Sequence, residues 1–145
     1  GAVYVWFRDN GVWRQQAFIK ASNPGQNDNF GARLMLSGDG NVLAVGAQLE
    51  NGSAKGINGK DDDAAEDAGA IYFYTRTAGV WAQQAYVKGS NTEAYDEFGS
   101  AMALNRDGSI MVVGARGEDS ASKGTHGDLN NNSADEAGAV YIFTY

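Results

Sequence analysis

The sequence predicts an all-β protein made of four-stranded antiparallel units, and two observations support this prediction. The first is a repeat: the N-terminal string GAVYVWFR returns as GAIYFYTR at residues 69–76 and as GAVYIFTY at residues 138–145. The second is a series of short segments rich in β-branched and aromatic residues, which are separated by glycine-containing turns and show no helical period. One such unit in every 68 residues indicates a β-propeller blade, because a solenoid rung of that length would be unusual.

The repeat has a regular period. Gly69 lies 68 residues after Gly1, and Gly138 lies 69 residues after Gly69, so the second repeat carries one inserted residue. We therefore expect a single propeller segment over residues 1–145. Its expected parts are repeat 1 at about residues 1–68, repeat 2 at about residues 69–137, and a third copy of one strand at residues 138–145.

Each repeat contains four expected strands. In chain order, residues 2–7 form the first, and a turn leads into residues 12–20, whose mixed polar and apolar residues suit an outer strand exposed on one face. Residues 32–37 and 42–47 follow, joined by a Gly-Asp-Gly-Asn turn that is typical of hairpins. The apolar run at residues 42–45 predicts a strand buried on both faces. The corresponding later strands are residues 70–75, 80–88, 100–105, 110–115 and 139–144.

The nine expected strands begin and end part-way through a blade. If strands are lettered A to D from inside to outside, with Phe-Gly opening strand A and the GAVY string as strand C, the order is C-D, then A-B-C-D, then A-B-C. About two blades are present, and only the central one, residues 30–90, is complete. Because a blade normally buries its faces against neighbours, we expect neighbouring blades from a longer chain, of which this is a processed piece. The alternative is that other copies of the chain supply them, including through a strand-joined filament.

Two sets of short motifs resemble a known repeat family. The motifs are Phe30-Gly31 with Gly46-Ala47, and Phe98-Gly99 with Gly114-Ala115. They are similar to the FG-GAP repeat, which builds the seven-bladed propeller of integrin α chains and occurs in many bacterial surface proteins. The W-x-Q-Q-A motif at Trp13 and at Trp81 resembles the bacterial branch of these repeats in particular. The resemblance implies a propeller and a role in adhesion or ligand binding.

The sequence departs from the family at the calcium-binding turn. Integrin-type repeats often carry D-x-D-x-D-G between the first two strands of a blade, whereas residues 37–41 and 105–109 each hold one aspartate. One carboxylate cannot supply the roughly six to eight oxygens that Ca²⁺ takes. The family's calcium site is therefore not expected at these turns.

Two long acidic loops, residues 48–68 and 116–137, are the candidate cation sites, because loops of this length are often functional. Hard oxygen ligands at short spacing suit Ca²⁺, the one cofactor that the composition suggests. The other interpretation is a solvated acidic surface. The candidate ligands are Glu50, Asp61, Asp62, Asp63 and Asp67 in the first loop and Glu118, Asp119, Asp128 and Asp135 in the second, beside Glu66 and Glu136.

Other recurring residues are expected to be structural. Asp28 and Asp96 each precede Phe-Gly by two residues and are expected to accept backbone N–H bonds. The repeated Gln-Gln pairs predict hydrogen bonding on the outer strand. The only histidine, His126, is expected on the surface and not as a general base. The aromatic residues that recur in register, and that predict packing between blades, are Tyr4, Tyr72, Tyr141, Trp13, Trp81, Phe30 and Phe98.

Composition narrows the classes of function. The chain of 145 residues has a formal net charge of −7, which disfavours nucleic acid and anionic membrane surfaces as partners. No apolar run is long enough for a membrane-spanning helix, so membrane insertion is not expected. The chain has no cysteine, which excludes disulfides but not secretion.

We interpret the chain as a non-catalytic propeller module of a bacterial extracellular or cell-surface protein, which serves adhesion, ligand binding or scaffolding. Its expected partners are neighbouring blades and a protein or glycan ligand. The alternative is a structural subunit of a self-assembling surface polymer or oligomeric propeller. A lesser alternative is a polysaccharide-acting enzyme, because carboxylates are abundant. No nucleophile elbow, phosphate loop or zinc pattern supports catalysis, so no catalytic residue is assigned.

Overall fold

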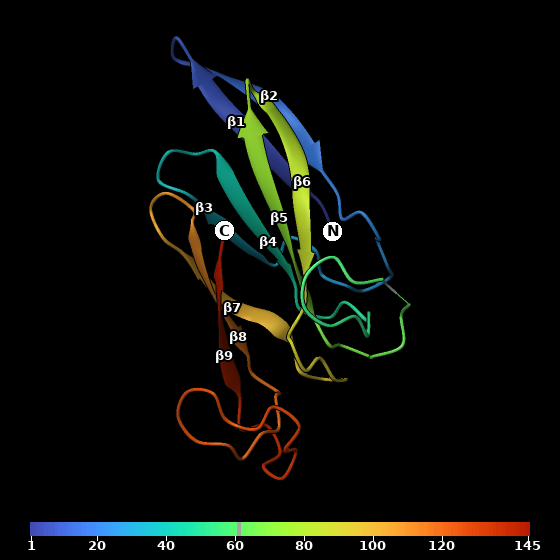
Figure 1. The fold of residues 1–145 in the computed structure, drawn as a ribbon. Helices are drawn as coiled ribbons and strands as arrows, with labels where there is room; N and C mark the ends of the chain where they lie inside the picture. The colour runs from blue at the N-terminus through green and yellow to red at the C-terminus, as the bar shows by residue number, and fades with distance from the viewer. Residues whose placement is uncertain (61) are drawn as a thin grey trace.

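The computed structural model describes residues 1–60 and 62–145 and shows an all-β chain (Figure 1). The strands are β1 (Val3–Asp9), β2 (Val12–Ile19), β3 (Arg33–Leu36), β4 (Val42–Ala47), β5 (Ala70–Thr77), β6 (Val80–Val87), β7 (Phe98–Leu104), β8 (Ile110–Ala115) and β9 (Ala139–Thr144). Every pairing between them is antiparallel. In the described part of the chain, no helix is long and apolar enough to span a membrane.

The strands form three sheets of different size. A first sheet holds β1 and β2, a central sheet has the order β3-β4-β5-β6, and a third sheet has the order β7-β8-β9. This confirms the predicted order of C-D, A-B-C-D and A-B-C, with β1, β5 and β9 as the three C strands. Figure 1 shows the β1–β2 hairpin at one end of the molecule and the third sheet at the other, with the complete central sheet between them.

Tight turns join strand C to strand D in both repeats. Asn10 and Gly11, between β1 and β2, have φ values of 47° and 85°. Ala78 and Gly79 occupy the same places between β5 and β6, with φ values of 50° and 82°. Positive φ at both central residues is the pattern of a type I′ turn, whose twist matches the twist of the strands that it connects.

The GAVY and Phe-Gly motifs meet where one sheet packs against the next. A Cβ added at Gly69 would lie 2.2 Å from the carbonyl oxygen of Phe98, and Gly69 has a φ of 79°. A Cβ added at Gly1 would lie 1.8 Å from the carbonyl oxygen of Phe30. Glycine therefore opens the repeated string because only glycine lets the backbone of the next sheet come this close.

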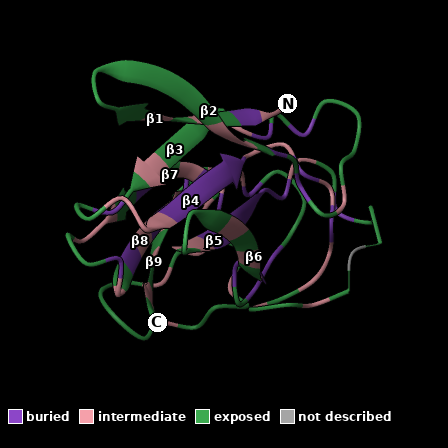
Figure 2. Ribbon diagram, turned by 90° about the horizontal axis from the view of Figure 1, so that it is seen from above, coloured by how far each residue is buried: buried purple, intermediate pink, exposed green. Residues whose placement is uncertain are grey.

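The core lies in two layers between the three sheets. Figure 2 shows β4 buried, whereas β2 and β3 are largely exposed. Leu43, Ala44 and Val45 are buried, which confirms the prediction of a strand covered on both faces. The cluster between the first and central sheets includes Val3, Ile19, Phe30, Val45, Tyr72, Tyr74 and Tyr86. The cluster between the central and third sheets includes Ile71, Phe73, Val87, Phe98, Met102, Met111 and Val113.

The recurring aromatic residues pack between sheets only where a neighbouring sheet is present. Phe30 and Tyr72 have ring centroids 5.2 Å apart, and Phe98 and Tyr141 repeat this contact at 5.4 Å. Tyr4 and Trp13 are 58% and 62% exposed, and their packing against a further blade stays a prediction. Both lie on the first sheet, and no other sheet of the described chain covers that face.

Candidate functional site

The two acidic loops connect strand B to strand C, as predicted. The first links β4 to β5 and the second links β8 to β9. In Figure 1 the first loop, drawn in green, lies beside the end of the central sheet, and the second, in orange and red, extends from the end of the third sheet. Both loops therefore lie at the end of a sheet where candidate carboxylates could gather.

The first loop places Glu50 in a buried polar cluster. The side chain of Glu50 is 1% exposed, and that of Lys88, directly after β6, is 0% exposed. Lys88 Nζ donates to Glu50 Oε2 at 2.7 Å. Tyr86 Oη donates to Glu50 Oε1 at 2.7 Å, and Asn23 Nδ2 donates to the same oxygen at 3.0 Å. Because both charges are buried, removing either one would leave the other uncompensated.

Asn23 connects this cluster to strand β5. It follows β2, and its Oδ1 accepts a hydrogen bond of 2.7 Å from the hydroxyl of Tyr72. The cluster thus links the segment after the first sheet to two strands and a loop of the central sheet. The five residues Asn23, Glu50, Tyr72, Tyr86 and Lys88 are called the first junction cluster below.

The second repeat contains part of the same cluster. Glu118 is 2% exposed, Asn91 Nδ2 donates to its Oε1 at 2.9 Å, and the hydroxyl of Tyr141 donates to Asn91 Oδ1 at 2.5 Å. These three residues, called the second junction cluster, correspond to Glu50, Asn23 and Tyr72. Glu118 Oε2 accepts the backbone N–H of Ser120 at 3.0 Å. The counterparts of Tyr86 and Lys88 would belong to a fourth strand, whereas the third sheet ends at β9.

Among the remaining carboxylates of the first loop, Asp62 bonds within its own loop. Asp62 accepts the backbone N–H of Ser53 at 2.9 Å and its hydroxyl at 2.7 Å, and these bonds lower the pKa of Asp62. Burial and the negative charges of two neighbouring glutamates raise the pKa of Asp67. Asp63, another candidate ligand, lies in a turn of the loop with a φ of 50°. Asp61 lies outside the described residues.

The second loop uses its carboxylates in the same way. Asp119 Oδ1 accepts the backbone N–H of Glu136 at 2.8 Å. Asp128 Oδ1 accepts the backbone N–H of Asn130 at 3.0 Å. Asp135 is exposed. These contacts fix the loop conformation from within.

The described carboxylates do not form a metal centre. Among residues 1–60 and 62–145, no group of three or more His, Asp or Glu side chains is placed to hold a metal ion. Ca²⁺ takes about six to eight oxygen ligands, whereas Glu50 is paired with Lys88 and Asp62 with Ser53. The described geometry therefore does not fit a calcium site, and calcium binding by the loops stays a prediction from composition.

Asp28 and Asp96 accept backbone N–H groups, which confirms their predicted role. The N–H of Gly25 donates to Asp28 Oδ2 at 2.6 Å, and the N–H of Glu93 donates to Asp96 Oδ2 at 2.8 Å. Burial raises the pKa of Asp96 to about 6, and the negative charge of Glu118 adds to this shift while the bond from Glu93 opposes it. The two aspartates therefore hold the turn into strand A by hydrogen bonds.

Gln16 confirms the hydrogen-bonding role predicted for the repeated glutamines. Its Oε1 accepts from Trp81 Nε1 at 3.0 Å and from Arg76 Nη1 at 3.1 Å, so it bridges the first and central sheets. The Arg76 guanidinium also lies 5.6 Å from the centre of the Trp81 ring. His126 is exposed, with a φ of 65°, as expected for a surface loop residue.

Lys88 is the important residue that sequence reasoning missed. A signal was present, because Lys20 and Lys88 both close the W-x-Q-Q-A strand, and Glu50 and Glu118 recur at the same interval. Charged residues that repeat at the period of the fold indicate a shared structural contact. The acidic composition of the loops instead led to a metal-binding interpretation for both glutamates.

The three sheets, stacked through two packed junctions, are blades of a β-propeller, and the central sheet is a complete four-stranded blade. The family model described as the FG-GAP repeat matches residues 13–74 and 81–143. The chain belongs to the FG-GAP repeat family. No curated protein and no solved structure matches it.

Proposed function

We propose that this chain is a non-catalytic FG-GAP propeller module of a bacterial extracellular or cell-surface protein, which serves adhesion, ligand binding or scaffolding. The observation that carries the proposal is the first junction cluster. Its ionisable pair, Glu50 and Lys88, is buried and connects the β4–β5 loop to the end of β6, while Asn23 ties Glu50 to the segment after the first sheet. Because these recurring polar residues have a structural role, ligands would bind at the exposed surfaces instead. This is expected of a module that binds partners and does not catalyse a reaction.

An aromatic face on the first sheet is the proposed contact surface for a partner, which is a neighbouring blade, a protein or a glycan. Tyr4, Trp6, Trp13 and Phe18 are 58%, 53%, 62% and 55% exposed. In the register of the sheet Tyr4 pairs with Phe18, with ring centroids 5.1 Å apart, and Trp13 pairs with Arg8 at the other end. Exposed aromatic residues gathered on one face are typical of interaction surfaces.

Binding of the intact chain to arrays of glycans and matrix proteins tests this proposal. The expected result is a bound class whose signal falls on Trp6→Ala and Trp13→Ala substitution. Leu129→Ala, at an apolar residue of the second acidic loop that is 46% exposed, is the control and should leave the signal unchanged. Arrays that stay blank with folded protein would contradict adhesion.

The same aromatic face also supports the alternative of a self-assembling subunit. Tyr4 and Trp6 correspond to Tyr72 and Tyr74, which are 0% and 4% exposed where the central sheet packs on the first. A preceding blade, from a longer chain or from a second copy, would bury them in the same way. Sedimentation that detects only monomers at high concentration would contradict self-assembly. The enzyme alternative gains no specific observation from the described residues.

Calcium binding has its own test, because a cation that binds only the folded chain must raise its stability. Thermal unfolding is measured with added Ca²⁺ and with a chelator. A midpoint that falls on chelation would support the cation interpretation of the acidic loops, and an unchanged midpoint would remove it.

A further inference from the structure

The first junction cluster brings together three groups that can react with one another. Lys88 carries an amine, Asn23 carries a side-chain amide, and Glu50 contacts both. Glu50 Oε2 accepts from Lys88 Nζ at 2.7 Å, and Glu50 Oε1 accepts from Asn23 Nδ2 at 3.0 Å. One carboxylate thus contacts the nitrogen of a nucleophile and the nitrogen of a leaving group, which is the arrangement that proton transfer between the two requires.

The carbonyl group of Asn23 is held by a separate donor. The Tyr72 hydroxyl donates to Asn23 Oδ1 at 2.7 Å, so it faces the oxygen on which negative charge develops when a nucleophile attacks the amide carbon. A donor at this oxygen stabilises the tetrahedral intermediate of acyl transfer. Tyr72 is 0% exposed, and its ring centroid lies 5.2 Å from that of Phe30 and 5.4 Å from that of Tyr86. The packed rings therefore fix the donor in place.

The reacting pair is shielded from water. The side chains of Lys88 and Glu50 are 0% and 1% exposed. Residues 56–58 of the first acidic loop run along the end of β6, where the Lys88 N–H donates to the Gly56 carbonyl oxygen at 2.8 Å. Because burial penalises charge, transfer of a proton from Lys88 to Glu50 replaces two buried charges with two neutral groups. The same transfer frees the lone pair of the amine for attack.

We propose that Lys88 and Asn23 form an intramolecular isopeptide bond, with Glu50 as the group that transfers the protons. Glu50 takes a proton from the Lys88 ammonium, and Nζ attacks Cγ of Asn23 while the Tyr72 hydroxyl bonds to Oδ1. Glu50 then passes protons to Nδ2, the Cγ–Nδ2 bond breaks, and the nitrogen leaves as ammonia. In balance, one ammonium group and one carboxamide give a secondary amide and an ammonium ion, and the carboxylate is regenerated. The reaction needs no further reactant.

The bond joins the first sheet to the central sheet. Asn23 follows β2 and Lys88 follows β6, so the new amide spans the junction between two blades. A covalent link between residues that are distant in the chain restricts the unfolded chain and so stabilises the folded one. The reaction occurs once, within the chain, and acts on no external substrate. The inference therefore goes beyond the proposed function, which does not require a covalent bond.

The experiment measures the mass of the purified full chain and maps its tryptic peptides. Formation of the bond releases one ammonia, so we expect an intact mass lower than the sequence mass by about 17 Da. Trypsin does not cleave after an acylated lysine, so residues 21–33 and residues 77–106 should appear as one linked peptide. The map is essential because an asparagine that cyclises on its own backbone loses the same mass but links no two peptides.

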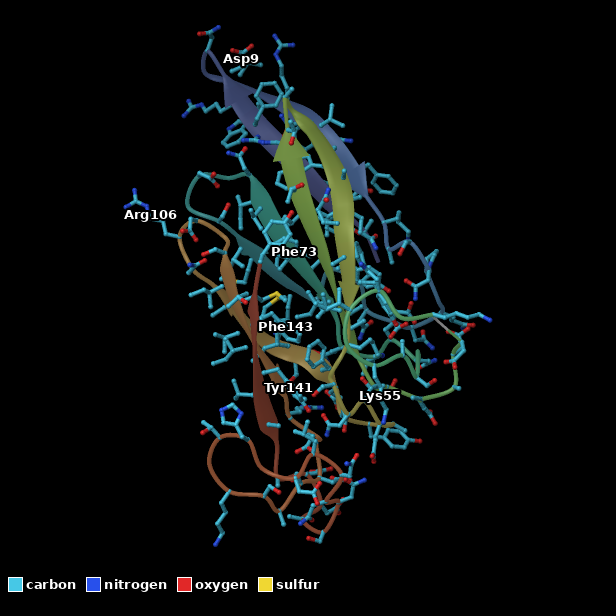
Figure 3. All side chains as sticks on the ribbon, viewed as in Figure 1. Asp9, Lys55, Phe73, Arg106, Tyr141 and Phe143 are labelled. Atoms are coloured by element: carbon cyan, nitrogen blue, oxygen red, sulfur yellow. The ribbon has the colours of Figure 1, made fainter. Side chains whose placement is uncertain are left out.

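Three variants test the part that each group plays. Lys88→Arg keeps a positive charge beside Glu50 but removes the amine, and Glu50→Gln keeps the shape of the side chain but removes the group that transfers protons. Both should abolish the linked peptide. Lys55→Arg, at an exposed lysine of the first acidic loop that Figure 3 labels, is the matched control and should retain it.

The map of the unsubstituted chain decides the proposal even where a variant does not fold. A folded chain whose peptides 21–33 and 77–106 are separate would overturn it. A loss of about 18 Da, with Lys88 linked to the peptide that holds Glu50, would show that water leaves from the glutamate and would overturn the role of Asn23. A linked peptide that persists in Glu50→Gln would overturn the role of Glu50.

Discussion

The first and second junction clusters use the same residues in different states of completion. In the first, Glu50 accepts from Lys88, Tyr86 and Asn23, and both charges are buried. In the second, Glu118 accepts from Asn91 and from a backbone N–H. The difference arises because the central sheet has a fourth strand and the third sheet ends at β9.

This comparison shows that a repeated residue acquires its role from the neighbouring strand. Lys20 and Lys88 occupy the same place in the repeat, yet Lys20 is exposed and donates to the Gly1 carbonyl oxygen, whereas Lys88 is fully buried. In a repeat protein, stability depends on the interfaces between units as well as on the units. Substitutions at matched positions can therefore separate the contribution of the junction from that of the repeat.

The largest expected contrast is between Lys88→Met and Lys20→Met. Lys88→Met leaves Glu50 buried without its cation and should lower the free energy of unfolding by about 3–5 kcal/mol. Lys20→Met removes an exposed charge and should change it by less than about 0.5 kcal/mol. Chemical denaturation of both variants measures these values. Equal losses would show that burial of the ion pair does not distinguish the two lysines.

Gly69→Ala and Gly138→Ala compare two equivalent glycines. Gly69 precedes β5 and lies against the backbone of the next sheet, whereas Gly138 precedes β9 and has no such contact within the described chain. Both glycines have positive φ, so alanine costs about 1 kcal/mol at each. A Cβ at Gly69 would also collide with the Phe98 carbonyl oxygen, whereas at Gly138 the nearest atom is 3.5 Å away. We expect Gly69→Ala to cost about 1–3 kcal/mol more than Gly138→Ala, because overpacking carries that penalty. A smaller loss for Gly69→Ala in the same denaturation assay would contradict the described approach of the two sheets.

The pH dependence of stability tests the titration of Asp96, which lies beside Glu118 of the second junction cluster. Asp96 has a pKa of about 6 in the folded chain against an ordinary value of 3.8, so the folded chain binds its proton more tightly. The contribution of Asp96 to stability should therefore be fully present below about pH 4 and be lost as pH rises through 6, by an amount on the order of 1 kcal/mol. Asp96→Asn should remove this fall. A pH profile that the substitution leaves unchanged would show that Asp96 does not titrate in this window.

The smallest expected effect compares Trp81→Phe with Trp13→Phe. Trp81 donates its Nε1–H to Gln16 at 3.0 Å across the first junction, whereas Trp13 is 62% exposed. Loss of one such hydrogen bond should cost about 1 kcal/mol, and the substitution at Trp13 should cost less than that. Thermal unfolding of the pair measures the difference, and a larger loss at Trp13 would indicate that the first sheet is covered in solution.

Much of the fold was predictable because it depends on local patterns. The type I′ turn at Asn10-Gly11, the buried run from Leu43 to Val45 and the phase of the three sheets follow from turn chemistry, hydrophobicity and the repeat. The hydrogen bond from the Gly25 N–H to Asp28 is also a local contact, within three residues. Such features need no knowledge of distant partners.

The candidate site was less predictable because its contacts are distant in sequence. Glu50 and Lys88 are 38 residues apart, and only the pairing of β5 with β6 brings them together. Trp13 is exposed whereas Trp81 packs at the first junction, because packing at a repeated position also requires a neighbouring sheet. Composition identified the loops as acidic, but it could not tell that Glu50 points inward while Asp135 is exposed.

Hydrogen exchange of the backbone amides in β5 and β9 tests the central claim most directly, because these are equivalent strands with and without a fourth strand beside them. The amides of β5 that face β6 should be strongly protected, and the corresponding outward-facing amides of β9 should exchange faster by roughly two orders of magnitude or more. Equal protection of the two strands in the isolated chain would contradict an open edge at β9.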